Sequence, residues 1–293
     1  MTSQLSLQHS ARIVRHFVST RAPEVLALQA SPILGSFLGG FRLDRPDLTR
    51  LGVLLLGSLA LTAHIFIFND WAGYSSDILD PQRGVLVFTQ KGISRCQVAT
   101  VAIVLLILAN VALAIVGGMA MLLGVVIAVL SLLYSCSPNF GKSKPVVGSI
   151  NHLLGGAAHF LLGYTFAHPL DVNGLAISLF FGLVFAGGHL NQEVRDYEGD
   201  LLNGIRTTAV VFGRPFAFLA GLGTFTAAYT IVASLAIFGV LPSILLWSPL
   251  VWLLHLVWSF QGWQRGLGFE TALWMQKRYR LLFALIGLAM LIR

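Results

Sequence analysis

Charged side chains are scarce in this sequence of 293 residues. Asp, Glu, Lys and Arg make up only 11% of it, whereas 56% of the side chains are hydrophobic and the mean hydropathy is +0.80. Soluble domains usually carry about a quarter charged residues, so this chain has few groups with which to wet its surface. The shortage excludes a soluble globular enzyme, a nucleic-acid-binding module and a disordered protein. It predicts a membrane protein with several spans.

Cysteine is also scarce, and a cleavable leader is not expected. Cys96 and Cys136 are too few for a disulfide framework or a zinc site, so we interpret them as small residues near helix ends. Residues 1–21 contain Arg but no apolar core followed by a small-residue cleavage site. We therefore expect residues 1–21 to form a cytoplasmic N-terminal segment.

Long apolar stretches fill the rest of the chain. A transmembrane helix needs about 20 predominantly apolar residues, and nine stretches meet this length. The sequence predicts an all-α fold, a polytopic membrane helix bundle of nine transmembrane helices, as a single domain over residues 1–293. The predicted spans are 22–41, 51–69, 97–116, 118–135, 147–167, 173–191, 215–238, 240–260 and 272–292.

The distribution of basic residues predicts the orientation of these spans. Lys and Arg are enriched in the cytoplasmic loops of membrane proteins. With a cytoplasmic N-terminus, only four of the 19 basic residues lie outside, namely Arg42, Arg45, Arg50 and Arg293. We expect an integral protein of a bacterial inner membrane with its C-terminus outside. The net charge of +7 then reflects loops beside anionic membrane lipid, and no nucleic-acid partner is expected.

Acidic residues are concentrated in two short stretches, 69–80 and 191–200, which hold seven of the 12 Asp and Glu residues. Each stretch follows a predicted span, and both spans end at the cytoplasmic face. An ionised carboxylate near hydrocarbon costs about 2.5–3.5 kcal/mol, so clusters at this depth indicate function.

The spacing of these acids predicts a metal site. Glu193, Asp196 and Asp200 share one helix face. Asp70 and Asp77 also share a face, but about 10.5 Å apart along the axis, too far for one ion with ligands near 2.1 Å. The two stretches together suit more than one hard cation. Mg²⁺ fits better than zinc because no His or Cys accompanies the acids. The candidate catalytic and metal-binding residues are Asp70, Asp77, Asp196 and Asp200, with Asp80 and Glu193 as additional metal candidates.

Basic residues accompany both acidic stretches. Lys and Arg bind phosphate oxygens directly, so acids that hold a metal beside basic side chains predict a diphosphate site at the membrane surface. The basic candidates are Arg83, Lys142, Lys144, Arg195 and Arg206.

These residues resemble the UbiA superfamily of intramembrane prenyltransferases. Its first motif, NDxxDxxxD, is similar to Asn69-Asp70…Asp77, and its second, DxxxD, to Asp196…Asp200 with the continuation to Arg206-Thr207. Its Tyr-to-Lys stretch is similar to Tyr134-Ser135 followed by Lys142 or Lys144. The resemblance covers nearly the whole chain. It implies Mg²⁺-dependent transfer of an isoprenyl group from a prenyl diphosphate to a lipophilic, in some cases aromatic, acceptor at the cytoplasmic face. It adds Asn69, Tyr134 and Asn191 to the candidates for diphosphate binding.

The first motif departs from the family pattern, because Gly73 stands where the middle Asp is expected. Asp80 could curl back into the gap, Glu193 could supply the missing charge, or the metal could be held more weakly. The freed volume also keeps a membrane terpene cyclase acting on a prenyl diphosphate open. A further alternative, of a different class, is a non-catalytic binder or transporter of lipid diphosphates.

Aromatic and histidine side chains near the same helix ends are candidates for the rest of the site. A carbocation formed from an allylic diphosphate needs an apolar or aromatic cavity. Phe66, Phe68, Trp71 and Tyr74 lie close to the first motif, and His189 is the best candidate for a base that deprotonates an acceptor.

Overall fold

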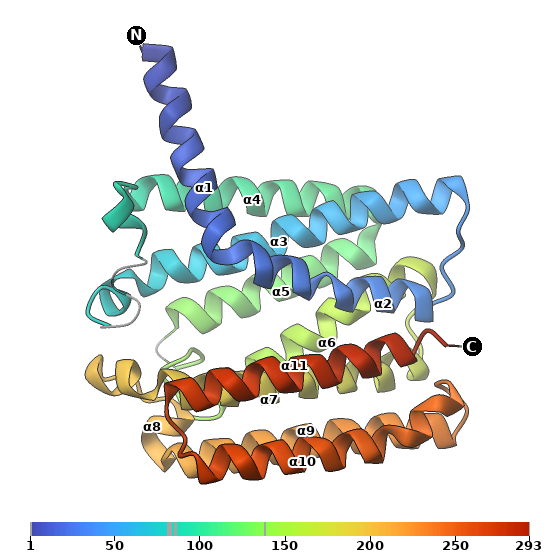
Figure 1. Ribbon diagram of the computed structural model, residues 1–293. Coiled ribbons are helices and arrows are strands. Elements are labelled where there is room, and N and C mark those ends of the chain that lie inside the picture. The colour runs from blue at the N-terminus through green and yellow to red at the C-terminus, as the bar shows by residue number, and fades with distance from the viewer. Residues whose placement is uncertain (1, 81–83, 85–86, 138, 293) are drawn as a thin grey trace.

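The computed structural model describes residues 2–80, 84, 87–137 and 139–292, and every regular element in them is a helix. The long helices lie side by side in one bundle, from which the first part of α1 projects (Figure 1). The α-helices are α1 (Thr2–Leu28), α2 (Ala30–Leu38), α3 (Arg45–Asp77), α4 (Arg95–Val116), α5 (Gly118–Cys136), α6 (Val147–Ala167), α7 (Val172–Leu202), α8 (Thr208–Phe212), α9 (Arg214–Ile237), α10 (Ser248–Gln264) and α11 (Phe269–Ala289). Two 3-10 helices are η2 (Phe88–Lys91) and η3 (Ser243–Trp247).

Six helical segments of the described chain are long and apolar enough to cross a membrane: Arg45–Asp77, Arg95–Val116, Gly118–Cys136, Val172–Leu202, Arg214–Ile237 and Ser243–Gln264. The prediction of nine spans is therefore not confirmed, although the all-α fold is. The predicted span 22–41 is broken at Gln29, and α2, at nine residues, reaches only about 13.5 Å against a hydrocarbon core of about 30 Å. Helices α6 and α11 include polar or charged residues that lower their hydropathy, such as Asn151 and Arg278.

Local sequence signals place the helix ends. Asp44 accepts a hydrogen bond from the Asp47 amide and caps α3, and Asp171 caps α7 by accepting from the Gly174 amide at 2.7 Å. That hydrogen bond is the largest cause of the lowered pKa of the Asp171 carboxyl. Gly117, at a φ of +153°, forms the one-residue connection between α4 and α5.

Two glycines allow α2 and α6 to pack with their backbones in contact. A Cβ at Gly163 would overlap the carbonyl group of Pro32, and a Cβ at Gly35 would meet the carbonyl oxygen of Phe160. Small residues of this kind let membrane helices approach closely, where van der Waals contact stabilises the pair. The crossing fixes the short helix α2 against the middle of the bundle.

The segments that carry the predicted site gather at one end of the bundle. Helices α3 and α7 both end there, and the short helix α8 and the turn η2 lie at the same end, at the left of Figure 1. The chain between α5 and α6 also runs there. Residues far apart in the sequence are thereby brought to one face of the fold.

Candidate functional site

A polar pocket lies at this end of the bundle, between the ends of α3 and α7. It contains about 600 Å³ of space, part of it open to solvent. Both acidic stretches contribute to its wall, together with the end of α5 and the segment that follows α7. Eight of the predicted site residues line it: Asn69, Asp77, Asp80, Tyr134, Lys142, Glu193, Asp196 and Asp200.

Helix α7 carries the second acidic stretch on one face because it continues without interruption to Leu202. Arg195 donates two hydrogen bonds to Asp196, from Nε at 2.8 Å and from Nη2 at 2.9 Å. The same guanidinium donates to Gln276 Oε1 at 3.0 Å, on α11. Asp196 is therefore oriented by an arginine that is itself tied to a neighbouring helix. Arg195 does not line the pocket wall; it acts on Asp196.

Gly204 ends α7 and turns the chain back toward the pocket. Its φ of +65° is left-handed, and the amide of Ile205 donates to the Asp200 carbonyl at 2.8 Å. This geometry gives a physical reason for the glycine in the predicted continuation of the second motif. Arg206, two residues further on, is exposed and does not line the pocket.

The acids of the first stretch lie in two different places, some in the pocket and one beside α1. Asp77 and Asp80 line the pocket, whereas Asp70 does not. Asp70 is paired with Arg21 of α1, whose Nε donates at 2.9 Å and whose Nη2 contacts the second carboxylate oxygen. Burial lowers the pKa of the nearby His16, and the charge of Asp70 partly offsets this effect. Asp70, the first acid of this stretch, is thus paired with an arginine and does not face the pocket with Asp77.

The remaining acid of the first stretch reaches across to α7. The Asp80 carboxylate lies so close to Gly199 that a Cβ at that position would overlap its Oδ2 atom. Gly199 stands between Asp196 and Asp200 in the sequence. Of the alternatives for the gap at Gly73, the structure thus brings Asp80 to the second acidic stretch and not back along α3.

The surroundings of Gly73 contain a positive charge. A Cβ built there would lie 3.4 Å from Lys142 Nζ and 3.2 Å from Asp77 Oδ2. Position 73 thus faces the pocket wall, beside both groups. The Lys142 amide donates to the Tyr134 carbonyl at 3.0 Å, which fixes the start of the loop to the end of α5.

The loop that carries Lys142 is anchored to α8 at its other end. Val146 has a φ of +69°, which is strained for a β-branched residue, and its amide donates to Thr208 Oγ1 at 3.0 Å. Lys144, in the same loop, is exposed and does not line the pocket. The loop therefore presents one of its two lysines to the site.

Glu193 is 4% exposed and engages the protein on both sides. Its Oε2 accepts from the Ala209 amide at 3.0 Å, and its Oε1 lies 3.4 Å from His189 Nδ1. His189 also forms hydrogen bonds with the Tyr134 hydroxyl at 3.2 Å and with Ser149 Oγ at 3.1 Å. The carboxylate thus fixes α8 to α7 while it contributes to the pocket wall.

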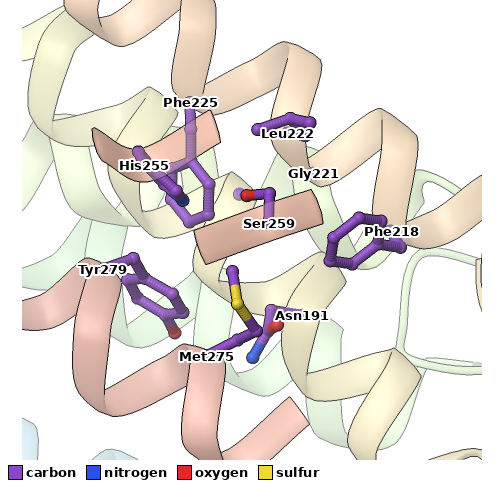
Figure 2. Close-up of a pocket in the computed structure, with 10 residues that line it drawn as sticks. Asn191, Phe218, Gly221, Leu222, Phe225, His255, Ser259, Met275 and Tyr279 are labelled. Atoms are coloured by element: carbon purple, nitrogen blue, oxygen red, sulfur yellow. The ribbon is translucent and has the colours of Figure 1, made fainter. Parts of the chain in front are cut away.

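Asn191 lies in a second, smaller cavity. Its Nδ2 donates to the Ala272 carbonyl at 3.1 Å, and Figure 2 shows its side chain next to Met275. His255, Ser259 and Tyr279 also line this cavity, which is formed by α7, α9, α10 and α11. The structure therefore does not bring Asn191 to the acidic pocket. Arg83 lies outside the described residues.

Several residues of the pocket were not predicted from the sequence. Ser76, Gln192, Asn203, Ile205 and Thr207 line it as uncharged neighbours of the acids. The predicted aromatic residues take other positions: Phe68 stacks on Trp71, and Arg95 lies over the rings of Trp71 and Tyr74 at 5.3 and 5.2 Å. His189, the predicted base, does line the pocket.

The acidic side chains of the pocket do not by themselves form a complete metal-binding site in the described residues. In the part of the chain that the structure describes, no group of three or more His, Cys, Asp or Glu side chains is arranged to hold a metal ion alone. The donors are nevertheless carboxylate, amide and hydroxyl oxygens, the ligands of hard cations. Mg²⁺ usually binds through one or two carboxylates and completes its shell with water and substrate phosphates.

The fold and the pocket define a class of protein: a helical membrane protein with an acidic, lysine-bearing pocket at one end of its bundle. The chain belongs to the UbiA prenyltransferase family, whose model matches residues 33–289. Family membership and the six long apolar helices make it an integral membrane protein. A comparison with curated protein sequences finds no match.

Solved structures share the fold. A UbiA homolog from Archaeoglobus fulgidus bound to GPP and Mg²⁺ is 21% identical, with a TM-score of 0.71 over 94% of this chain and 99% of that chain. The same homolog bound to DMAPP and Mg²⁺ gives 20% identity and a TM-score of 0.72, over 94% and 98% of the two chains. A UbiA homolog from Aeropyrum pernix K1 is 15% identical, with a TM-score of 0.67 over 90% and 96%. At these identities the likeness establishes the fold.

Proposed function

We propose that this protein transfers an isoprenyl group from a prenyl diphosphate to a lipophilic acceptor, with Mg²⁺, at the cytoplasmic face of the membrane. The observation that carries the proposal is the meeting of the two acidic stretches and Lys142 in one pocket of a UbiA fold. The relative from Archaeoglobus fulgidus binds GPP or DMAPP together with Mg²⁺ and gives the donor class independent support.

The proposed roles follow from the position of each side chain. The carboxylates of Asp77, Asp80, Asp196 and Asp200 would hold Mg²⁺, which when bound neutralises the charge that develops on the departing diphosphate. Lys142 binds a diphosphate oxygen directly as a point charge. Arg195 keeps the Asp196 carboxylate oriented.

His189 is the proposed proton acceptor. It lines the pocket, and its two ring nitrogens are held by the Tyr134 hydroxyl and Ser149 Oγ. A base here can remove the proton that an acceptor loses when the new bond forms, or the proton that a cyclising chain loses. A membrane terpene cyclase is the second candidate, because Gly73 departs from the prenyltransferase motif pattern.

Product analysis tests the function. Purified full-length protein is incubated with Mg²⁺ and prenyl diphosphates of several chain lengths, with and without a lipid extract as the source of acceptor. We expect Mg²⁺-dependent pyrophosphate release that needs the extract, and a prenylated product in the mass spectrum. Release without the extract, together with a cyclic hydrocarbon or alcohol, would instead establish the cyclase. Binding of the diphosphate without any release would leave only the binder or transporter.

The orientation of the pocket gives a further prediction. In a variant with serine at both native cysteines, single cysteines are placed at Asn139 and Leu202, near the pocket, and at Leu43, at the other end of the bundle. All three positions are exposed. In intact cells, a membrane-impermeant maleimide should label only the cysteine at 43.

Permeabilised cells serve as the control, since there all three positions should react. Labelling at both 139 and 202 but not at 43 would reverse the proposed orientation. Labelling at only one of the two positions near the pocket would contradict the assembly of the site itself, because its parts would then lie on opposite sides of the membrane.

A further inference from the structure

We infer that α1 is an interfacial helix, which lies in the headgroup layer of the membrane and binds anionic lipid through Arg12 and Arg15. This role is separate from the proposed chemistry. Three observations carry it: the depth at which α1 meets the bundle, the direction in which it leaves, and the apolar and basic side chains that it exposes there.

The place at which α1 meets the bundle is close to the membrane boundary. Helix α3 has 33 residues and is about 50 Å long, which exceeds a hydrocarbon core of about 30 Å by about 10 Å at each end. Asp70 lies about 10.5 Å before the last residue of α3, and Arg21 of α1 pairs with it. Further toward the start of α1, Arg12 Nη1 would lie 3.2 Å from a Cβ at Gly92, in the connection between α3 and α4. Helix α1 therefore contacts the bundle at the depth of the headgroups.

The first part of α1 leaves the bundle across the direction of the long helices (Figure 1). The long apolar helices set the direction in which the chain crosses the membrane, so this part of α1 extends along the membrane plane. A helix in that position meets hydrocarbon on one side and water on the other, which suits a sequence with both apolar and basic exposed residues.

The exposed and buried side chains of α1 lie on different faces. Phe17 is buried against the bundle, in one apolar cluster with Ile67 and Phe88. Val14 and Val18 lie one turn apart on another face, and are 62% and 57% exposed. In water these two side chains would stay unburied, whereas the upper edge of the hydrocarbon covers them when α1 lies in the interface.

Basic side chains border this apolar face. Arg12 and Arg15 are exposed and lie three residues apart, so they share one side of the helix. Residues 1–23 contain no Asp or Glu, and this part of the sequence therefore carries only positive charge. Arginines near an anionic bilayer strengthen binding to it, and their aliphatic stems let the charge reach lipid phosphates from beside an apolar face. Anionic lipid is the partner that fits these charges.

Lipid quenching tests the position of α1. In full-length protein with serine at both native cysteines, a single cysteine replaces Val18 or its exposed neighbour Ser19. Each cysteine carries the fluorophore NBD, and the protein is reconstituted in liposomes of phosphatidylcholine and phosphatidylglycerol. We expect lipids with a nitroxide on the acyl chain to quench the label at 18 at least about twofold more than the label at 19, because neighbouring residues lie about 100° apart around a helix.

Three other outcomes of the quenching experiment would contradict the inference. Weak quenching at both positions with emission typical of water would place α1 in solvent. Strong and equal quenching at both positions would place it inside the hydrocarbon. Blue-shifted emission at 18 without quenching would mean that protein, such as a second copy of the chain, covers the apolar face.

Hydrogen exchange tests the dependence on lipid charge. Backbone amides of residues 11–26 are followed by mass spectrometry in liposomes with and without phosphatidylglycerol. We expect exchange at least about tenfold slower with the anionic lipid, because two arginines then hold α1 on the surface. The double variant Arg12→Gln with Arg15→Gln should lose this difference.

A second double variant, Arg42→Gln with Arg45→Gln, is the matched control. It removes the same charge from exposed positions at the other end of the bundle and should keep the effect of phosphatidylglycerol on α1 within about twofold. Exchange that is independent of phosphatidylglycerol in the unaltered protein would overturn lipid binding by α1. Loss of the effect in the control would overturn it as well, since the effect would then follow net charge. Neither readout needs turnover, so the outcome is independent of the proposed function.

Discussion

Replacement of Asp200 by asparagine is expected to lower the rate of prenyl transfer at least about a hundredfold, a loss of about 2.7 kcal/mol in transition-state stabilisation. Asp200 lines the pocket one helical turn after Asp196 and opposite Asp80. The substitution keeps the volume of the side chain but removes the charge that we propose binds Mg²⁺. Steady-state kinetics with saturating diphosphate measures the effect.

A neighbouring acid provides the control for this substitution. Glu198 lies on the same helix, is exposed, and pairs with Arg214 at 2.5 Å away from the pocket. Glu198→Gln should therefore keep activity within about twofold, since exposed ion pairs contribute about 0–1 kcal/mol. A loss of less than about tenfold in Asp200→Asn, about 1.4 kcal/mol, would contradict a ligand role for this carboxylate.

Replacement of Gly163 by valine is expected to give the largest loss of stability among single substitutions in the bundle. The new Cβ would overlap the Pro32 carbonyl, which is backbone and cannot rotate away. Overpacking of this kind costs about 1–3 kcal/mol or more. At about 2–4 °C per kcal/mol for a chain of this size, that is roughly a 2–12 °C fall in the melting temperature. Thermal unfolding of the detergent-solubilised protein, followed by circular dichroism, measures it.

Gly155 offers a matched control on the same helix. A Cβ at Gly155 meets nothing within 4 Å, so Gly155→Val should unfold within a few degrees of the unaltered protein, the residual change being the difference in helix propensity. If the two variants melted together, the crossing of α2 over α6 would not be as close as described. The position along α6, and not valine itself, is thus what the comparison isolates.

The common helix face of Asp196 and Asp200 could be predicted from the sequence because helical periodicity is a local property. Asp196 and Asp200 lie on the pocket face as their spacing requires, and the family to which their motif pointed is confirmed. The direction of Asp80 was left open, since Asp80 follows the end of α3 and its course depends on α7. Helical spacing predicts the direction of side chains within a helix, and it does not apply to Asp80, which lies beyond the last residue of α3.

Contacts between distant segments were beyond prediction. Arg21 meets Asp70 across 49 positions of the chain, and nothing in either segment signals the pairing. Asn191 shares α7 with Asp196 but lines a different cavity. Two positions five residues apart differ by about 140° around a helix of 3.6 residues per turn, so the two side chains leave on different faces. The number of spans also depended on the break at Gln29, which separates α1 from α2 one turn before Pro32, a residue that has no N–H to continue the helical hydrogen bonds.

The contact between Arg21 and Asp70 has a consequence for where the boundary of this protein is drawn. The family match begins at residue 33, after all of α1. Yet α1 contributes Arg21, which contacts Asp70 in the first acidic stretch. The region that the family model matches therefore does not contain every side chain that contacts the two acidic stretches. An expression truncation or fusion designed from the matched region alone would remove the arginine that pairs with Asp70, together with the first residues of α2.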